Sequence, residues 1–377
     1  VLHYQPKVNM RSGEVIGAEA LIRWQHPDQG LLAPVEFLPP IAQHPLEVEL
    51  GRWVIDTALT QIAAWQDAGV DLPVSVNISG FHLQQAGFLD ELRALLAAHP
   101  NVPRGYLELE VLESSALEDI ALVSAVIDAS ATLGVSFALD DFGTGYSSLT
   151  YLKRLPAQVL KIDQSFVRDM LQDSDDLAIL EGILGLATAF RRTAIAEGVE
   201  TVAHGETLLR LGCDLGQGYG IARPMAAADL PAWRQRWRPD PRWAHAHCLD
   251  RELMPVLIAG VEHRGWIVAL GEHLDGRRDA PPPLDHHQCR FGQWLDKTIH
   301  QPRHAATFAT IETLHLRVHA LAADLLKRRS QGHDVEALAG MAELHALWDA
   351  LLVHLEYLLK DDPRSLAPSS GGGSNCR

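Results

Sequence analysis

Short β-rich runs alternate with longer amphipathic stretches along roughly the first 240 residues. The alternation predicts strands at Leu2 to Pro6, Val15 to Ile22, Val74 to Ile78, Tyr106 to Val111, Ser136 to Asp140, Val159 to Ile162, Thr193 to Ala196 and a short run ending near Leu215. Helical spacing predicts helices between them, including Val48 to Ala68, Ala116 to Leu133 and Leu177 to Phe190. Strands that alternate with helices indicate a parallel α/β fold. Seven or eight such units predict a closed (β/α)8 barrel of the TIM-like type.

Strand signals are absent from the remainder of the chain, which has a helical pattern. Apolar residues recur at three-to-four spacing in Asp250 to Leu274, His304 to Arg328 and Val335 to Leu359. Breaks such as Pro281-Pro282-Pro283 separate these segments. The pattern predicts a small all-α four-helix bundle with antiparallel helices.

The distribution of histidine supports a boundary between two domains. Six of the 19 histidines precede residue 240 and 13 follow it, while Pro239 and Pro241 end the preceding helix and stiffen a connector. We expect a barrel over 1–240, a linker over 241–249, a bundle over 250–362 and a flexible Gly/Ser-rich tail over 363–377. The chain opens in a strand without an initiator Met, so we expect its N-terminus to be truncated.

Composition and charge exclude several classes of function. A formal charge of −16, from 32 Lys and Arg against 48 Asp and Glu, disfavours DNA binding and docking on anionic membranes. The best apolar run, Ala178 to Phe190, contains Glu181 and is too short to span a bilayer. The four cysteines lack the spacing of a secreted disulfide framework, and no signal peptide precedes the first strand. We therefore expect a cytoplasmic location and no membrane span.

Polar residues recur at the carboxyl ends of successive predicted strands. In Tyr106 to Val111, the period of two places Glu108 and Glu110 on one face, although the solvated face of an antiparallel edge strand has the same pattern. The other strands contribute Ser75, Asn77, Asp140, Asp141, Lys161 and Glu197. In a barrel these strand ends converge on one mouth, where barrel enzymes carry out their chemistry.

So many carboxylates at one mouth would repel one another unless cations intervened. Oxygen ligands favour Mg²⁺ or Mn²⁺ over metals that prefer thiolates. Two such ions about 3.5 to 4 Å apart would clamp the attacking and leaving oxygens of a phosphoryl displacement. The pattern therefore points to metal-assisted phosphoryl chemistry.

Seven motifs together identify a family resemblance over residues 2 to about 237. They are Glu19-Ala20-Leu21-Ile22-Arg23-Trp24, Asn77-Ile78-Ser79, Glu110-Val111-Leu112-Glu113, Asp140-Asp141-Phe142-Gly143-Thr144-Gly145-Tyr146-Ser147-Ser148-Leu149, Lys161-Ile162-Asp163, Ala196-Glu197-Gly198-Val199-Glu200-Thr201 and Gln217-Gly218-Tyr219. The set resembles the EAL-domain phosphodiesterases, which hydrolyse cyclic di-GMP to linear pGpG. This resemblance implies that the chain is a phosphodiesterase with cyclic di-GMP as its substrate.

The resemblance also implies a role for each matching residue. Two Mg²⁺ or Mn²⁺ ions per active site would be held by Glu19, Asn77, Glu110, Asp140 and Asp141, with Asp141 bridging them. Lys161 would orient or activate the nucleophilic water, and a salt bridge to Asp141 is the alternative. Glu197 would complete the metal site directly or through water, with Gln217 positioning water and Glu200 in a supporting role.

Substrate binding is assigned by the same resemblance to Arg23, through charge-assisted hydrogen bonds to a phosphate, and to Leu21 and Gln5. Glu113 resembles the residue that anchors the loop opened by Asp141. Leu112 departs from the family, which usually has Thr there, and this departure removes a supporting hydrogen bond.

The family resemblance further implies a homodimer. A catalytically silent cyclic di-GMP receptor that signals by changing shape is the alternative function. Because the metal, lysine and loop positions are all filled by the expected residue types, we favour an active enzyme.

In the helical part, His315 and His319 lie four residues apart and can share a metal, although solvated or core histidines have the same spacing. His263-Arg264-Gly265-Trp266 and Cys289-Arg290-Phe291-Gly292-Gln293-Trp294 resemble the chemoreceptor zinc-binding domain over about residues 250 to 360. The resemblance implies one Zn²⁺ held by His263, Cys289, His315 and His319. Four protein ligands leave no open position, so we expect a structural or sensory zinc that regulates the barrel.

Two alternatives concern the helical part. The cluster Asp285-His286-His287-Gln288 offers a competing ligand beside Cys289, but a solvated loop is the better explanation of it. A hemerythrin-like di-iron site would need carboxylates, for which Glu312 and Glu356 do not make a convincing set.

Overall fold

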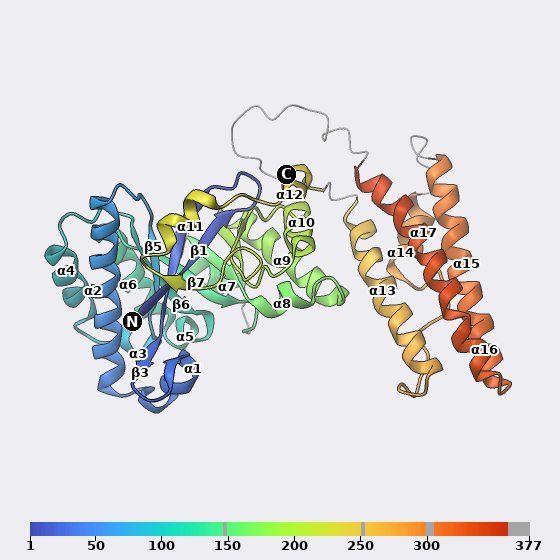
Figure 1. Cartoon of the computed structure of the whole chain (residues 1–377), viewed down its shortest axis with the longest axis horizontal. Coiled ribbons are helices and arrows are strands. Elements are labelled where there is room, and N and C mark those ends of the chain that lie inside the picture. The colour runs from blue at the N-terminus through green and yellow to red at the C-terminus, as the bar shows by residue number, and fades with distance from the viewer. Residues whose placement is uncertain (146–148, 250–252, 299–304, 361–377) are drawn as a thin grey trace. The chain divides into compact units, whose positions relative to one another are not determined.

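A computed structural model describes residues 1–145, 149–249, 253–298 and 305–360 in two compact units (Figure 1). One unit comprises Val1–Arg168 and Ile179–Ala246, and the other comprises Asp169–Ala178 and His247–Arg377. The predicted tail at 363–377 and the loop residues 146–148 lie outside the described residues. Among the helices described, none combines the length and the apolar character required to cross a membrane.

Eight strands form a closed barrel, as the alternating pattern predicts. They are β1 (Leu2–Asn9), β2 (Val15–Ile22), β5 (Val74–Asn77), β6 (Leu107–Leu112), β7 (Ser136–Phe142), β8 (Val159–Ile162), β9 (Thr193–Ala196) and β10 (Leu215–Gly216). Their order is β10-β9-β8-β7-β6-β5-β2-β1, and pairing of β1 with β10 closes the ring. The short β11 (Met225–Ala226) pairs with the start of β1, and β3 (Trp24–His26) pairs with β4 (Gly30–Leu32) in a separate hairpin.

The barrel differs from the expected all-parallel arrangement at β1, which is antiparallel to both β2 and β10. The reason is the connection to β2, which spans only residues 10–14. A parallel neighbour would need a crossover of a dozen or more residues, whereas a short turn produces a hairpin. Gly13 closes this turn with φ 77°, a left-handed conformation that glycine adopts without steric cost.

Helices surround the strands of the barrel (Figure 1). They are α1 (Pro34–Phe37), η1 (Pro39–Ile41), α2 (Pro45–Asp67), α3 (Gly80–Leu83), α4 (Phe88–Ala98), α5 (Glu113–Glu118), α6 (Ile120–Leu133), α7 (Leu149–Arg154), α8 (Gln164–Asp169), α9 (Ser174–Ala189), α10 (Val202–Arg210), α11 (Leu230–Arg236) and α12 (Pro241–His245). The helix expected over Ala116 to Leu133 is divided at Asp119. The carboxylate of Asp119 accepts a hydrogen bond from the Leu122 N–H at 3.0 Å and so caps α6.

The segment that follows α11 is packed on the barrel. Trp243 in α12 is 2% exposed, and its indole N–H donates to the Val202 carbonyl at 2.9 Å. A Cβ at Gly205 would lie 2.4 Å from that indole, so only glycine leaves room for it. The barrel unit consequently ends at Ala246, within the expected linker.

The barrel has a polar interior and an apolar exterior layer. On β6, Leu107, Leu109 and Val111 are buried on the face away from Glu108 and Glu110. This alternation fills the space between sheet and helices with apolar side chains and directs the charged side chains inward. The charged groups of different strands can therefore meet inside the barrel.

The second unit is the predicted all-α bundle. Its helices are α13 (Met254–Leu274), α14 (Arg290–Thr298), α15 (Ala305–Ser330), α16 (Asp334–Ala339) and α17 (Met341–Lys360). The long helices α13, α15 and α17 lie side by side, and their shared core includes Leu270, Val318 and Leu351 (Figure 1). The single helix expected over Val335 to Leu359 is divided at Gly340, where a Cβ would lie 2.2 Å from a methyl group of Leu325.

Candidate active site and zinc site

Four carboxylates from different strands surround one buried ammonium group in the barrel. Lys161 on β8 places its Nζ 2.5 Å from Glu110 Oε2 and 2.6 Å from Glu197 Oε1. The same Nζ lies 2.9 Å from Asp140 Oδ1 and 3.4 Å from Glu19 Oε2. Lys161 is 1% exposed, so these ion pairs are screened little by water.

Burial and mutual repulsion set the protonation of this cluster. Burial, followed by the charge of Glu110, raises the pKa of Glu19 to about 7, and burial raises the pKa of Glu197 to about 8. At Glu110 burial is outweighed by the ammonium groups of Lys161 and Lys7, which lower the pKa to about 2. Burial alone would lower the pKa of Lys161, but the carboxylates around it raise that pKa well above its ordinary value. One lysine cannot neutralise all of these acids, so the cluster has the charge to hold divalent cations.

Amide side chains fix the orientation of Glu19. Asn77 Nδ2 donates to Glu19 Oε1 at 2.6 Å, and Gln217 Nε2 donates to Glu19 Oε2 at 2.6 Å. Gln217 Nε2 also donates to Gln5 Oε1 at 2.9 Å. Gln5 lies opposite Glu19 in the β1–β2 register, and its own amide donates to the Ala222 carbonyl at 2.9 Å. The structure thus gathers Asn77, Gln217 and Gln5 around one carboxylate.

Asp140 and Asp141 are adjacent in β7, and strict alternation would direct them to opposite faces. Asp141 has φ 52°, a left-handed conformation, and the β7–β8 register is irregular at this point. Carboxylate oxygens of Asp140, Asp141 and Glu197 consequently lie within 4.8 Å of one another. Oxygens of Glu19, Glu110 and Asp140 form a second group within the same limit. Two groups of hard oxygen ligands that share Asp140 fit a pair of divalent cations.

The loop after β7 is held by Glu113. Oε2 of Glu113 accepts a hydrogen bond from the Gly143 N–H at 2.8 Å. A Cβ at Gly145 would lie 3.1 Å from Glu113 Oε1, so the loop passes close to the carboxylate. Since Gly143 is two residues beyond Asp141, this hydrogen bond restrains the backbone that carries Asp141.

The expected substrate-binding residues continue β2 toward the mouth. Leu21 follows Glu19 by two residues on β2 and therefore shares its face, and Arg23 is the first residue after the end of β2. A cavity of about 520 Å³ lies beside Arg23 and is lined in part by Trp24, Phe37 and Trp53. An arginine next to an open aromatic pocket provides the two features that a nucleotide phosphate and base require.

Two of the predicted positions lie outside the carboxylate cluster. Glu200 is exposed and belongs to neither oxygen-ligand group, although its backbone N–H donates to His204 Nδ1 at 3.4 Å. Leu112, at the end of β6, is 43% exposed. It follows Glu110 at a period of two and so lies on the face of the acids, at the exposed end of the strand, and the departure from Thr leaves the oxygen ligands in place.

One buried charge was not anticipated from the sequence. Lys7 Nζ on β1 lies 2.8 Å from Glu108 Oε1, 2.9 Å from Ser75 Oγ and 3.5 Å from Glu110 Oε1. Lys7 therefore holds the oxygen of Glu110 that Lys161 does not contact. The period-two spacing of Gln5 and Lys7 on β1 carries the same inward-facing signal as the glutamates of β6.

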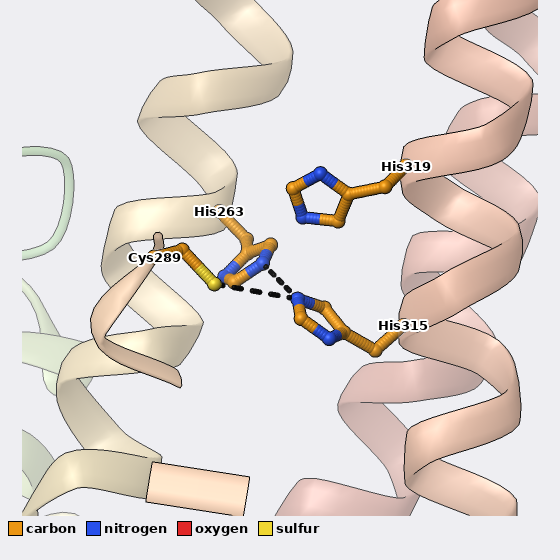
Figure 2. A group of neighbouring side chains, drawn as sticks. All are labelled: His263, Cys289, His315 and His319. Atoms are coloured by element: carbon orange, nitrogen blue, oxygen red, sulfur yellow. Dashed lines mark hydrogen bonds between the residues drawn. The ribbon is translucent and has the colours of Figure 1, made fainter. Parts of the chain in front are cut away.

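The bundle brings its four predicted ligands together (Figure 2). His263 is on α13, Cys289 directly precedes α14, and His315 and His319 are on α15. His315 Nε2 lies 3.1 Å from His263 Nε2 and 3.5 Å from Cys289 Sγ. Tetrahedral zinc, with bonds of about 2.05 Å to nitrogen and 2.3 Å to sulfur, separates its ligand atoms by about 3.3 Å and 3.6 Å respectively. The spacing of these side chains therefore fits a zinc ion.

The hydrogen bonds of His263 and His319 leave the Nε2 atom of each imidazole free of a proton. His263 Nδ1 donates to the Ala259 carbonyl at 3.0 Å, and His319 Nδ1 donates to the Leu284 carbonyl at 2.8 Å. Each imidazole therefore keeps a lone pair on Nε2, and the buried Nε2 of His319 has no hydrogen-bond partner among the described residues. Burial lowers the pKa of His263 to about 4 and that of His315 to about 2, so both are neutral at pH 7.

The carboxylates of the di-iron alternative lie elsewhere. Glu312 and Glu356 are exposed and are not part of the metal-ligand group that the described part of the bundle contains. The bundle site is therefore built from three imidazoles and one thiol, a donor set that suits zinc.

The fold and the site together define this unit as a barrel domain with a cluster of carboxylates that can bind metal ions. The family model of the EAL domain matches residues 1–224, so the chain belongs to the EAL-domain family. A second family model, the chemoreceptor zinc-binding domain, matches residues 263–326. That match begins at His263 and contains the other three ligands.

The barrel is similar to several named proteins. The bifunctional diguanylate cyclase/cyclic di-GMP phosphodiesterase MucR of Pseudomonas aeruginosa is 46% identical over 233 residues, which are 62% of this chain and 34% of that protein. The cyclic di-GMP phosphodiesterase PdeR of Escherichia coli is 39% identical over 237 residues, 63% of this chain and 36% of that protein. The chain spans about a third of the length of these relatives.

A solved structure extends the similarity to three dimensions. The PaMucR phosphodiesterase in complex with c-di-GMP has a TM-score of 0.59 and 45% sequence identity, covering 61% of this chain and 93% of that chain. The matched share corresponds in size to the barrel.

The raised pKa values of Glu19 and Glu197 predict a pH-dependent response to metal. In the folded barrel these two carboxylates bind protons more tightly than in the unfolded chain, where the pKa of a glutamate is near 4.3. Their protonation therefore contributes fully to the stability of the fold below about pH 4, and this contribution is lost as the pH rises through about 7 and 8. Divalent cations bind the deprotonated carboxylates and compete with these protons. We expect the rise in unfolding temperature caused by Mg²⁺ or Mn²⁺ to be greater at about pH 9 than at about pH 6.

Differential scanning calorimetry of the metal-free protein, with and without added Mg²⁺, measures this difference. Glu197→Gln removes a carboxylate whose pKa is raised to about 8, compared with about 7 at Glu19 and about 6 at Asp141, and should flatten the pH dependence. An equal stabilisation by Mg²⁺ at both pH values in the unsubstituted protein would contradict the proton competition.

Proposed function

We propose that the barrel hydrolyses cyclic di-GMP to linear pGpG with two bound divalent cations, Mg²⁺ or Mn²⁺. The observation that carries this proposal is the pair of oxygen-ligand groups sharing Asp140, with Lys161 buried between them. The named relatives support the choice of substrate, because two of them are cyclic di-GMP phosphodiesterases and one solved structure is a c-di-GMP complex.

The cation ligands are Glu19, Asn77, Glu110, Asp140 and Asp141, with Glu197 completing the set. When bound, the cations supply Lewis acidity that lowers the pKa of water and neutralises charge on the phosphodiester. Lys161 lies at the centre of these ligands, with its ammonium 2.5 Å from Glu110 and 2.6 Å from Glu197. From this position the Lys161 ammonium would donate a hydrogen bond to the attacking water.

The hydrolysis forms one P–O bond and breaks another. The water oxygen bonds to phosphorus, the phosphorus–O3′ bond breaks, and the O3′ atom gains a proton to become a hydroxyl, which leaves a 5′-phosphate on the linear product. The water loses a proton in this reaction, and O3′ gains one. Lys161 and Glu197, 2.6 Å apart, can serve as the donor and the acceptor of these protons and can pass a proton between them. Gln217 positions water beside Glu19, whose oxygen it already contacts.

Arg23 provides the phosphate contact, and the adjacent cavity lined by Trp24, Phe37 and Trp53 provides a surface on which a guanine base can stack. Leu21 and Gln5 face the same mouth on β2 and β1. A ligand held at Arg23 would lie near the carboxylates, since Arg23 directly follows β2, which carries Glu19 and Leu21 on one face.

We expect Lys161→Met, which keeps the length of the side chain and removes its charge, to slow cyclic di-GMP hydrolysis by about 100-fold or more. Metal affinity should be retained or strengthened, because an ammonium that competes for the same carboxylates has been removed. Glu19→Gln should abolish turnover and also weaken metal binding. Single-turnover kinetics and titration calorimetry with Mn²⁺ measure the two properties separately.

Lys7→Met is the control for the loss of a buried lysine. Lys7 contacts Glu108 and Ser75 closely and reaches the ligand groups only at Glu110, at 3.5 Å, whereas Lys161 contacts four of their carboxylates. Its effect on turnover should be much smaller than that of Lys161→Met. An unsubstituted protein that binds cyclic di-GMP and Mn²⁺ but never forms pGpG would instead identify a silent receptor. Equal loss of turnover in the two lysine variants would remove Lys161 from the chemical step.

Glu113→Ala should lower both metal affinity and turnover by about 10-fold, because the loop that restrains Asp141 loses its acceptor for the Gly143 N–H. Leu112→Ala, one residue away and exposed, is the control and should change neither quantity. Wild-type metal affinity in Glu113→Ala would show that the loop does not position Asp141. The homodimer implied by the family resemblance stays a prediction, as does the cytoplasmic location.

For the bundle we propose one Zn²⁺, held by His263, Cys289, His315 and His319, that regulates the barrel. The converging lone pairs and the unpartnered Nε2 of His319 support the site. A bundle whose core surrounds the ligands would loosen if one ligand were lost. A structural zinc without influence on the barrel is the simpler possibility that an experiment must exclude.

We expect removal of zinc, or Cys289→Ala, to change cyclic di-GMP hydrolysis in the whole chain by a factor within about 5 to 150. A chain that ends at Ala246 should ignore both treatments, because it lacks all four ligands. Hydrolysis assayed at fixed Mg²⁺ over a range of buffered free zinc measures the effect. A flat response, with zinc shown to bind and dissociate, would leave the metal purely structural.

A further inference from the structure

A short loop, Leu284 to Cys289, is attached to the proposed zinc site at both of its ends. The carbonyl of Leu284 accepts the Nδ1 hydrogen of His319, and Cys289 supplies the sulfur ligand. Within the loop, Asp285 Oδ1 accepts the His287 N–H at 3.0 Å, and the His286 carbonyl accepts the Cys289 thiol at 3.3 Å. The loop is therefore a compact turn whose position relative to the ligands is fixed.

The first turn of α14 presses against this loop. A Cβ at Gly292 would lie 1.7 Å from the His286 carbonyl oxygen, a separation that no side chain allows. The Gly292 N–H also donates to Cys289 Sγ at 3.1 Å. Glycine at 292 thus permits the close approach that holds His286 beside the zinc ligands.

The imidazole of His286 lies at the edge of the ligand group. Its ring centroid is 6.1 Å from that of His315 and 6.2 Å from that of His319. The ligand histidines themselves have centroid separations of 4.7 to 5.7 Å. With Zn–N bonds of about 2.05 Å, two imidazoles on one tetrahedral ion have centroids about 5.2 Å apart. His286 is therefore only about 1 Å beyond ligand distance.

The neighbouring histidine is held differently. His287 is exposed, and its Nδ1 lies within hydrogen-bond distance of Asp296 Oδ2, at 2.9 Å, on the surface. Two adjacent histidines therefore differ in their surroundings: one is half-buried beside His315 and His319, and the other is engaged by a carboxylate of α14.

We propose that His286 is a reserve zinc ligand, which occupies the fourth coordination position when the thiolate of Cys289 is withdrawn. In the unsubstituted protein the sulfur completes a tetrahedral set and excludes a fifth donor. When the sulfur is lost, rotation of the His286 side chain on its fixed loop brings a nitrogen to the metal. This inference rests on the proposed zinc site. The exchange of Cys289 for His286 would change the ligand set without releasing the ion.

The test compares zinc affinity in the full chain by competition with a chromophoric chelator. Cys289→Ala should bind one zinc with an affinity about 10- to 100-fold weaker than that of the unsubstituted protein, and adding His286→Ala should cost about 10-fold or more again. His286→Ala alone should change affinity by less than about 3-fold, since the sulfur is present. His287→Ala in the Cys289→Ala background is the matched control and should have no further effect.

Zinc X-ray absorption supplies a second readout. The number of imidazole ligands should rise from three in the unsubstituted protein to four in Cys289→Ala, and return to three in Cys289→Ala/His286→Ala. If Cys289→Ala leaves the bundle unfolded, Cys289→Ser is used in the same series. An unsubstituted protein without zinc would overturn the zinc site and this proposal with it. A double variant that binds zinc as tightly as the single Cys289 variant, with three imidazoles in both, would overturn the reserve ligand alone.

Discussion

The repulsion between buried carboxylates is the constraint on which the barrel unit depends. Glu19, Glu110, Asp140 and Glu197 lie within reach of one ammonium group, and such a set is stable only with compensating charge. Lys161 and Lys7 supply part of that charge from opposite sides of Glu110. Because the interior is occupied by these groups, the apolar contribution to stability comes from the outer face of the sheet, where the strands meet the helices.

The two units solve the problem of holding a metal in opposite ways. The barrel offers anionic oxygens that must lose protons and whose charge exceeds what its lysines neutralise. The bundle offers three neutral imidazoles and a thiol whose pKa is raised by burial. Hard oxygen ligands favour Mg²⁺ and Mn²⁺, and the nitrogen and sulfur set favours zinc. The two donor sets therefore suit two different classes of cation.

Much of the fold follows from local pattern, since β2, β8 and β9 begin and end where the alternation predicts. The predicted parallel direction of β1 was wrong, because periodicity identifies a strand but does not show which strands pair with it or in which direction. The divisions at Asp119 and Gly340 were also missed, because each depends on a particular contact rather than on apolar spacing. A helical period continues across both positions, so only a capping carboxylate or a packed methyl group reveals the break.

The candidate sites show the same division between pattern and contact. Inward-facing glutamates were predictable from the period of two on β6, and the same rule applied to β1 would have found Lys7. The convergence of Asp140 with Asp141 was not predictable from alternation, because it requires a backbone conformation that departs from the strand. In the bundle, motif spacing pointed to the ligands, whereas the proximity of His286 depends on how its loop folds against Gly292.

The left-handed backbone of Asp141 narrows the residues that evolution can place there. Asparagine and glycine tolerate φ near 52° but lack a negative charge, whereas glutamate has the charge but is less suited to this conformation. Aspartate alone meets both the backbone and the charge requirement. Position 141 is therefore constrained by its backbone as well as by its charge, whereas Glu110 and Glu197 do not have a left-handed backbone.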